Sequence, residues 1–260
     1  MVKITKRYST TNTTEAKNRK IEWLVIHYTA GTSSKAGNAL NTADWFGSPE
    51  AKASADFICD DATIIQTNPD IKNRYCWAVG GSKYTSMTTS QGGKYYGKCT
   101  NRNSISIEMC SNKKDKSTLN ATDKDWFLTA ETVSNALELA RYLMDLYSID
   151  INHVIMHHHV TGKICPQPWT LEESYLSGWD NFIKQLKDNA PQKADTAFKV
   201  KVKAKSLNVR NGAGTKYKVN EAITDKGVYT IVATKKVKKS TWGKLKSGAG
   251  WINLKYTKRL

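Results

Sequence analysis

Residues 156–166 read MHHHVTGKICP and bring an imidazole, an amine and a thiol together within a few residues. A further histidine, His27, directly follows the apolar run WLVI at residues 23–26. Two imidazoles and one thiolate make a three-ligand zinc set with a fourth position left for water, which is typical of catalytic rather than structural sites. Lys163, two residues before Cys165, adds a positive charge where an oxyanion could form. The stretch therefore predicts a catalytic zinc centre with Cys165, His27 and one of the histidines 157–159 as ligands.

Four segments in order carry a family resemblance. Residues 157–166 resemble the H-x-D-V-T-G-K-x-C-P motif of zinc-dependent N-acetylmuramoyl-L-alanine amidases of the phage endolysin type, which share a fold with peptidoglycan recognition proteins. Residues 25–31 (VIHYTAG) resemble the first metal-ligand segment, and residues 104–110 (SISIEMC) resemble the strand with a catalytic glutamate. Residues 125–127, followed by a long helix and residues 153–155, resemble the approach to the second histidine.

The resemblance covers roughly residues 20–185 and implies a fold, a cofactor and a reaction. The implied fold is α/β, with a mixed central sheet flanked by helices. The implied cofactor is zinc, and the implied reaction is hydrolysis of the amide bond between N-acetylmuramic acid and L-alanine. The resemblance implies His27 as the first metal ligand, and the family's eight-residue spacing implies His157 and Cys165 as the second and third. The family match makes Glu108 the general base and Lys163 a catalytic cation.

Each of these residues has a plainer interpretation. A carboxylate on the apolar strand around Glu108 is costly unless it is paired or functional, so a core ion pair is the alternative. Lys163 could be one of many surface lysines, and His27 a hydrogen-bonded core histidine. Cys165 could be a nucleophile, but a catalytic thiol needs a base and usually a helix N-terminus.

Two neighbouring histidines and two departures from the family pattern leave roles open. Strand alternation would direct His158 away from His157. His159 stands where the family has aspartate. It could hydrogen-bond to a metal ligand, or it could be a solvated loop residue. Some relatives have a tyrosine where this chain has residues 54–57 (SADF), and many have a histidine where it has Ala78. Trp77 could line a groove or fill the core.

The charge of the chain is distributed unevenly. The 260 residues carry a net charge of +17. From Phe198 onward there are 17 basic and 2 acidic residues, whereas the first 197 residues hold 23 basic and 21 acidic ones. This asymmetry predicts two domains with different partners, and the basic one should bind a polyanion.

Three parts follow from the composition. We expect a zinc amidase domain at residues 1–186, a linker at 187–197 and a small all-β domain at 198–260. Residues 207–215 (LNVRNGAGT) and 250–253 (GWIN) resemble the two ends of a bacterial SH3-like barrel, a family that binds cell-wall peptides in many lytic enzymes.

Local patterns predict the main elements. Residues 21–27, 105–109 and 153–157 are expected as strands, and residues 57–65 as a hairpin. Residues 39–46 are expected as a short helix. Residues 122–125 resemble a capping box, and the helical spacing that follows begins at Trp126. A last amphipathic helix contains Trp179 and Leu186.

Targeting features favour a wall enzyme made in the cytoplasm. No 18-residue apolar span and no secretory signal are visible, and five cysteines do not suggest a disulfide framework. An endolysin of this kind would act on a wall, of the Gram-positive type by expectation, after release through a holin-type pore. The alternatives are a non-catalytic peptidoglycan recognition protein and a nucleic-acid-binding module. The retained ligands argue against the first, and the few aromatics among the C-terminal lysines argue against an obligate nucleic-acid partner.

Overall fold

A computed structural model describes residues 2–84, 89–171, 175–188 and 192–260. The chain divides into two compact units, Val2–Leu186 and Lys187–Leu260. Each unit is described by itself.

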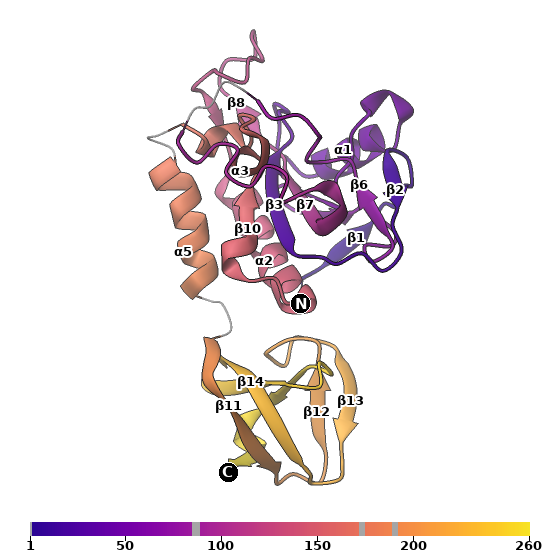
Figure 1. Ribbon diagram of the computed structural model, residues 1–260. Coiled ribbons are helices and arrows are strands. Elements are labelled where there is room, and N and C mark those ends of the chain that lie inside the picture. The colour runs from indigo at the N-terminus through magenta and orange to yellow at the C-terminus, as the bar shows by residue number, and fades with distance from the viewer. Residues whose placement is uncertain (1, 85–88, 172–174, 189–191) are drawn as a thin grey trace. The chain divides into compact units, whose positions relative to one another are not determined.

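A six-stranded sheet forms the centre of the first unit (Figure 1). Its strands, in spatial order, are β1 (Ile4–Lys6), β5 (Ile64–Gln66), β4 (Phe57–Cys59), β7 (Ser104–Met109), β3 (Trp23–Tyr28) and β10 (Val154–Met156). β4 and β5 are antiparallel, whereas β3 runs parallel to both β7 and β10. The predicted mixed α/β fold is confirmed. The strands β3 and β7 are buried along their whole length. The apolar run of β3 predicts this, whereas β7 alternates apolar residues with the buried Ser104, Ser106 and Glu108.

Helices cover the sheet. They are α1 (Asn38–Phe46), α2 (Ala130–Tyr147), α3 (His157–Thr161) and α5 (Asp180–Asp188). Leu24 and Ile26 of β3 pack in one cluster with Leu139 of α2 and Phe182 of α5. Val25 belongs to a different cluster, with Val79 and Ile155. Because side chains alternate along a strand, His27 lies on the same face as Val25, away from α2.

Helix α2 begins later than its sequence suggests. The capping box at residues 122–125 is wrong, because Trp126 and Phe127 form strand β9 (Trp126–Phe127), paired with β8 (Asn112–Lys113). The carboxylates of Asp123 and Asp125 bind the buried ammonium of Lys113 instead of a helix end. The N-cap is Thr129, whose side chain accepts a hydrogen bond from the Thr132 amide.

Short elements complete the first unit. They are the strands β2 (Thr13–Glu15) and β6 (Arg74–Cys76), and the short helical turns η1 (Pro49–Ala51), η2 (Asn101–Asn103), η3 (Ile151–His153), η4 (Gln167–Trp169) and η5 (Tyr175–Trp179). All five cysteines are free and buried.

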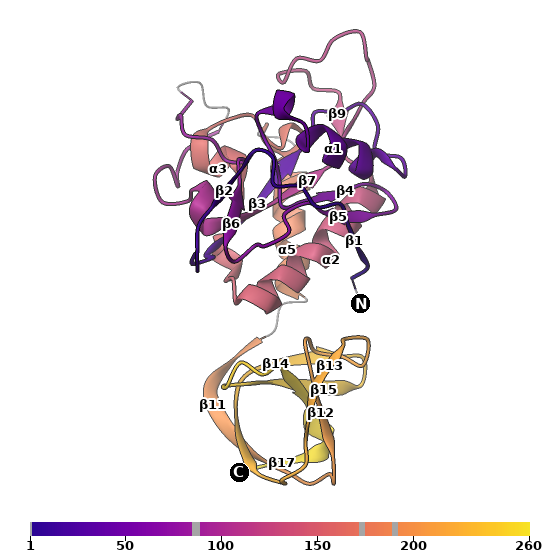
Figure 2. The same cartoon turned by 90° about the vertical axis from the view of Figure 1, so that its right-hand side faces the viewer.

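The second unit is an all-β structure with a seven-stranded, strongly curved sheet (Figure 2). Its strands, in spatial order, are β13 (Val219–Ile223), β12 (Leu207–Arg210), β16 (Trp251–Asn253), β15 (Ser240–Leu245), β14 (Val228–Val237), β11 (Gln192–Val202) and β17 (Thr257–Arg259); the turn η6 (Leu254–Tyr256) precedes β17. Val200, Val209, Ile231 and Ile252 fill its core. The expected linker at 187–197 is largely regular structure: α5 continues to Asp188 and β11 begins at Gln192, while residues 189–191 lie outside the described residues. Within the described residues, no helix combines the length and the apolar character that crossing a membrane would need.

Candidate active site

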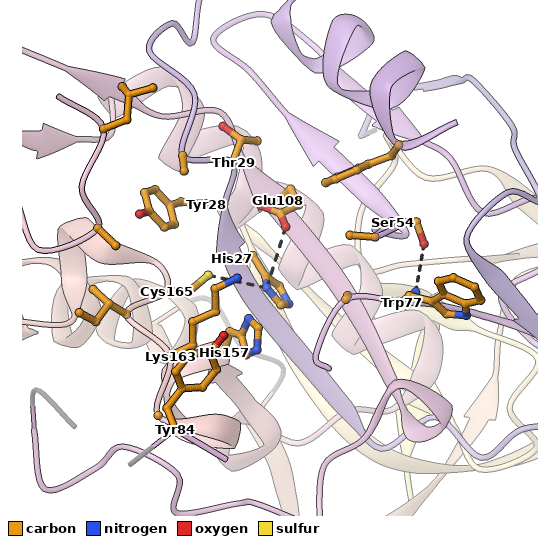
Figure 3. Close-up of a pocket in the computed structure, with 18 residues that line it drawn as sticks. His27, Tyr28, Thr29, Ser54, Trp77, Tyr84, Glu108, His157, Lys163 and Cys165 are labelled. Atoms are coloured by element: carbon orange, nitrogen blue, oxygen red, sulfur yellow. Dashed lines mark hydrogen bonds and ion pairs between the residues drawn. The ribbon is translucent and has the colours of Figure 1, made fainter. Parts of the chain in front are cut away.

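Strand register brings the predicted site residues to one edge of the sheet. His27 and Glu108 are direct partners across the parallel strands β3 and β7. On the other side of β3, Ile26 pairs with Met156, the last residue of β10, so His157 emerges beside His27. Since the carboxyl ends of parallel strands share an edge, three positions far apart in sequence meet there (Figure 3).

Three potential metal ligands converge at this edge. Ligand atoms of His27, His157 and Cys165 all lie within 4.8 Å of one another, and all three residues are buried. Sγ of Cys165 lies 3.8 Å from Nδ1 of His27. The centroids of the two imidazole rings are 4.7 Å apart.

The hydrogen bonds of these side chains are incomplete in a way that suits a cation. Nε2 of His157 donates to the backbone carbonyl oxygen of Val79 at 2.8 Å, which leaves Nδ1 of His157 with its lone pair free. Nδ1 of His157 and Nε2 of His27 are buried and have no hydrogen-bond partner. Buried polar atoms without partners are costly. Two imidazoles and a thiol that converge in this way, with a free lone pair on Nδ1 of His157, form a donor set that fits a zinc ion.

Burial sets the protonation of the three ligands. It lowers the pKa of His157 to about 3, with the nearby charge of Lys163 adding to the effect, and it lowers the pKa of His27 well below its ordinary value. Both imidazoles are therefore neutral, the form that binds metals. Burial also raises the pKa of the Cys165 thiol to about 12. Without a bound cation this thiol stays protonated and is a poor nucleophile.

Glu108 stands beside the three ligands. Its Oε1 lies 4.0 Å from Nδ1 of His27, and its Oε2 is buried without a hydrogen-bond partner. Burial raises the pKa of Glu108 to about 8, although the charge of Lys163 acts to lower it. A carboxyl group of this kind can exchange a proton near neutral pH.

A cavity of about 460 Å³ opens onto these residues. Lys163 lines it, and Figure 3 shows the amino group of Lys163 near Cys165 and His27. Tyr28, Tyr84 and Leu119 line it as well. None of these three residues was predicted from the sequence. Tyr28 directly follows His27, and that position could have indicated it.

Comparison with known proteins places the chain in a family. The family model for N-acetylmuramoyl-L-alanine amidase matches residues 17–168. The chain belongs to this amidase family. The matched range contains β3, β7, β10 and the 156–166 segment, and therefore all five residues described above.

Relatives within the amidase family are distant. The chain is 28% identical to N-acetylmuramoyl-L-alanine amidase CwlL of Bacillus licheniformis over 197 residues, which cover 73% of this chain and 49% of the relative. It is 28% identical to N-acetylmuramoyl-L-alanine amidase CwlH of Bacillus subtilis (strain 168) over 178 residues, 68% of this chain and 58% of the relative. The chain thus spans about half the length of the curated relatives it matches. The solved catalytic domain of XlyA is 25% identical, with a TM-score of 0.50, over 71% of this chain and 99% of that domain.

The two further histidines of the motif lie in a short helix and not in a strand. β10 ends at Met156, and residues 157–161 form α3. Both ring nitrogens of His158 are in use: Nε2 is 2.9 Å from Oγ1 of Thr89, and Nδ1 is 2.9 Å from the carbonyl oxygen of Lys163. His158 therefore points away from the ligands, because of helical geometry and not strand alternation.

His159, at the position of the family aspartate, is buried. Its Nδ1 accepts a hydrogen bond from the Met156 amide, and its ring meets Trp179 edge-on with 5.4 Å between centroids. The interpretation of His159 as a solvated loop residue is wrong. The side chain of His159 is buried and joins the first turn of α3 to Trp179.

Asp56 and Trp77, which lie at or beside the two departures from the family pattern, have different roles. The carboxylate of Asp56 is buried, and it accepts hydrogen bonds from Asn68 and Ser106 and lies 3.8 Å from the guanidinium of Arg19. Asp56 is therefore a structural residue. Trp77 is 42% exposed, lines the cavity and donates from Nε1 to Thr14. Its ring is available to a ligand and does not fill the core.

Proposed function

We propose that this protein is a zinc-dependent amidase that hydrolyses the bond between the lactyl group of N-acetylmuramic acid and L-alanine in peptidoglycan. The observation that carries the proposal is the convergence of His27, His157 and Cys165 beside Glu108, at the edge of an amidase-family sheet. A zinc ion held by these three ligands would act as a Lewis acid and lower the pKa of water toward neutrality.

Glu108 is the proposed general base. Its carboxylate is adjacent to the ligand His27, so it can take a proton from a water molecule at the site. The protonated carboxyl group can then give that proton to the nitrogen of the departing alanine. With a pKa of about 8, the Glu108 carboxyl group retains a proton near neutral pH when no cation is bound. The charge of a bound cation would lower this pKa and favour the carboxylate form.

Lys163 is the proposed electrostatic partner of the scissile carbonyl group. The positive charge of Lys163 lowers the pKa values of Glu108, His27 and His157. Its amino group is therefore close enough to act on a substrate held beside these residues. A fixed positive charge in a partly enclosed cavity stabilises negative charge on the carbonyl oxygen as it develops.

The second unit is the proposed wall-targeting domain. Its sheet is all-β, and its sequence resembles SH3-like barrels at residues 207–215 and 250–253. A net charge of +15 from Phe198 onward suits the anionic polymers of a Gram-positive wall. The protein would be made in the cytoplasm and reach the wall after release, as endolysins do.

Mass spectrometry of wall digests tests the central proposal. Purified Gram-positive walls digested by the protein should yield free N-termini on L-alanine and intact N-acetylmuramic acid lactyl groups, and added chelator should stop the reaction. New reducing ends on the glycan, or cleavage inside the stem peptide, would show a different activity. Wall binding without any cleavage would favour the receptor alternative.

A further inference from the structure

One face of strand β11 in the second unit carries a row of lysines. Lys199 and Lys201 lie in β11, and Lys203 directly follows its last residue; all three are exposed and alternate with the buried Val200 and Val202. Alternate residues of a strand point to one face and are about 6.6 Å apart, since the rise is about 3.3 Å per residue. The three lysine side chains therefore leave the backbone on one face, about 6.6 Å from one residue of the row to the next.

The neighbouring edge strand extends this row. In the antiparallel pairing of β11 with β17, Lys201 lies directly opposite Lys258, so these two side chains share a face (Figure 2 shows both strands). On the other side of β11, Thr230 lies opposite Lys199 and Val228 opposite Lys201. Like charges directly opposite each other destabilise a sheet. Among the side chains that the structure describes, no acidic group forms an ion pair with any of these lysines.

We propose that this lysine row, defined as Lys199, Lys201, Lys203 and Lys258, is the binding site for an anionic wall polymer whose backbone is joined by phosphodiesters. The inference rests on the proposed wall-targeting function and adds to it a surface and a ligand class. A linear polymer with regularly spaced phosphates can place successive charges along a linear row of ammonium groups. Its binding would also relieve the repulsion between Lys201 and Lys258.

The side chains that flank the row favour such a polymer over nucleic acid. Val228 and Thr230 offer no ring on which a base could stack. The ring of Phe198 is covered by the guanidinium of Arg259, which lies 4.1 Å from its centroid. Proteins that bind single-stranded nucleic acid combine basic grooves with open aromatic platforms. One open ring lies at the end of the row: Tyr256 is 48% exposed, and its carbonyl oxygen accepts a hydrogen bond from the Lys203 amide. A single ring there is one stacking position and not a platform for successive bases.

A matched pair of triple variants of the full chain tests the proposal. Lys199→Gln, Lys201→Gln and Lys258→Gln together remove three charges from the row. Lys218→Gln, Lys236→Gln and Lys239→Gln together remove three exposed charges elsewhere in the same unit. Co-sedimentation with purified walls, before and after chemical removal of the phosphate polymers, measures affinity at several salt concentrations.

The row variant should bind intact walls at least about tenfold more weakly, and its log–log salt slope should fall by about 2, as expected for three lost contacts at about 0.7 each. The control variant has the same net charge as the row variant. It should nevertheless bind within about twofold of the wild type, because its three lost charges lie outside the row. Stripping the polymers should remove the difference between the wild type and the row variant.

Equal losses in both variants would mean diffuse attraction and overturn the proposal, as would undiminished binding to stripped walls. Duplex DNA bound as tightly as the polymer would assign the row to nucleic acid instead. Release of alanine N-termini from soluble muropeptides should be the same in all three proteins, so a failure here is separable from a failure of the amidase proposal. A wild type that bound no wall preparation would refute wall targeting as a whole.

Discussion

Nε2 of His157 donates a hydrogen bond to the carbonyl oxygen of Val79 across 2.8 Å, and this contact selects the tautomer of the ring. The lone pair of His157 is left on Nδ1, in the same small volume as His27 and Cys165. When a histidine binds a metal, a hydrogen bond from its other ring nitrogen orients the ring and raises the basicity of the binding nitrogen. In this protein the acceptor is a backbone carbonyl oxygen, so the tautomer of His157 depends on the path of the chain near Val79.

Cys165→Ser should remove bound zinc and amidase activity together. A hydroxyl is a far poorer zinc ligand than a thiolate. Even the loss of a group that only hydrogen-bonds to a ligand costs about 10- to 100-fold in metal affinity, so the loss of a ligand should cost more. The two measurements are metal analysis of the purified protein and the appearance of free L-alanine N-termini in wall digests. Cys99→Ser, in a buried cluster outside the cavity, is the control and should retain both. Stoichiometric zinc with no activity would make Cys165 a nucleophile.

Glu108→Gln should keep zinc but reduce turnover by about 10²- to 10⁴-fold, the usual contribution of a general acid–base group. The amide is close in shape to the carboxyl group but cannot accept the proton. Turnover on soluble muropeptides and zinc content are measured together, with the exposed Glu50→Gln as control. Near-normal turnover in a zinc-loaded variant would remove Glu108 from the mechanism.

The same substitution should change how the metal-free protein responds to pH. Glu108 holds its proton up to about pH 8 in the folded state, whereas the ordinary value for the unfolded chain is 4.5. The stability that Glu108 contributes to the wild type is therefore lost as pH rises between these values, and Glu108→Gln has no such loss. The Tm of the variant minus that of the wild type, measured in chelator, should grow from about pH 4.5 to about pH 8. A difference independent of pH would mean that Glu108 is solvated in the folded protein.

Local sequence was enough to predict β3, β7 and β10 and the hairpin of β4 and β5, which are five of the six strands of the central sheet. The choice of His27, His157 and Cys165 as candidate ligands came from the family resemblance, and the structure brings these three residues together. The pairing of His27 with Glu108 depends on strand register, which no local pattern encodes. The start of α2 was missed for the same kind of reason: Asp125 looks like a capping residue in sequence, but a lysine twelve positions earlier binds it.

That lysine provides the last prediction. The side chain of Lys113 is 1% exposed, with Nζ 2.7 Å from Asp125 and 3.0 Å from Asp123. Nζ also donates to the carbonyl oxygen of Asp115 and lies over the ring of Trp126. Residues 114–125 thus fold around one buried charge, and Leu119 within them lines the catalytic cavity.

Lys113→Met should loosen this wall of the cavity while leaving the zinc ligands in place. We expect a higher KM for muropeptides, unchanged zinc content and a lower Tm, whereas the neighbouring, exposed Lys114→Met should change none of these. The pH dependence gives a further check. Hydrogen bonds from Thr118 and Lys113 lower the pKa of Asp123, and one from Lys113 lowers that of Asp125. The wild type should therefore lose this stabilisation as pH falls below the ordinary value of 3.8, and the variant should show a smaller loss there. An unchanged KM in a variant with a lowered Tm would show that Lys113 stabilises the fold without shaping the cavity.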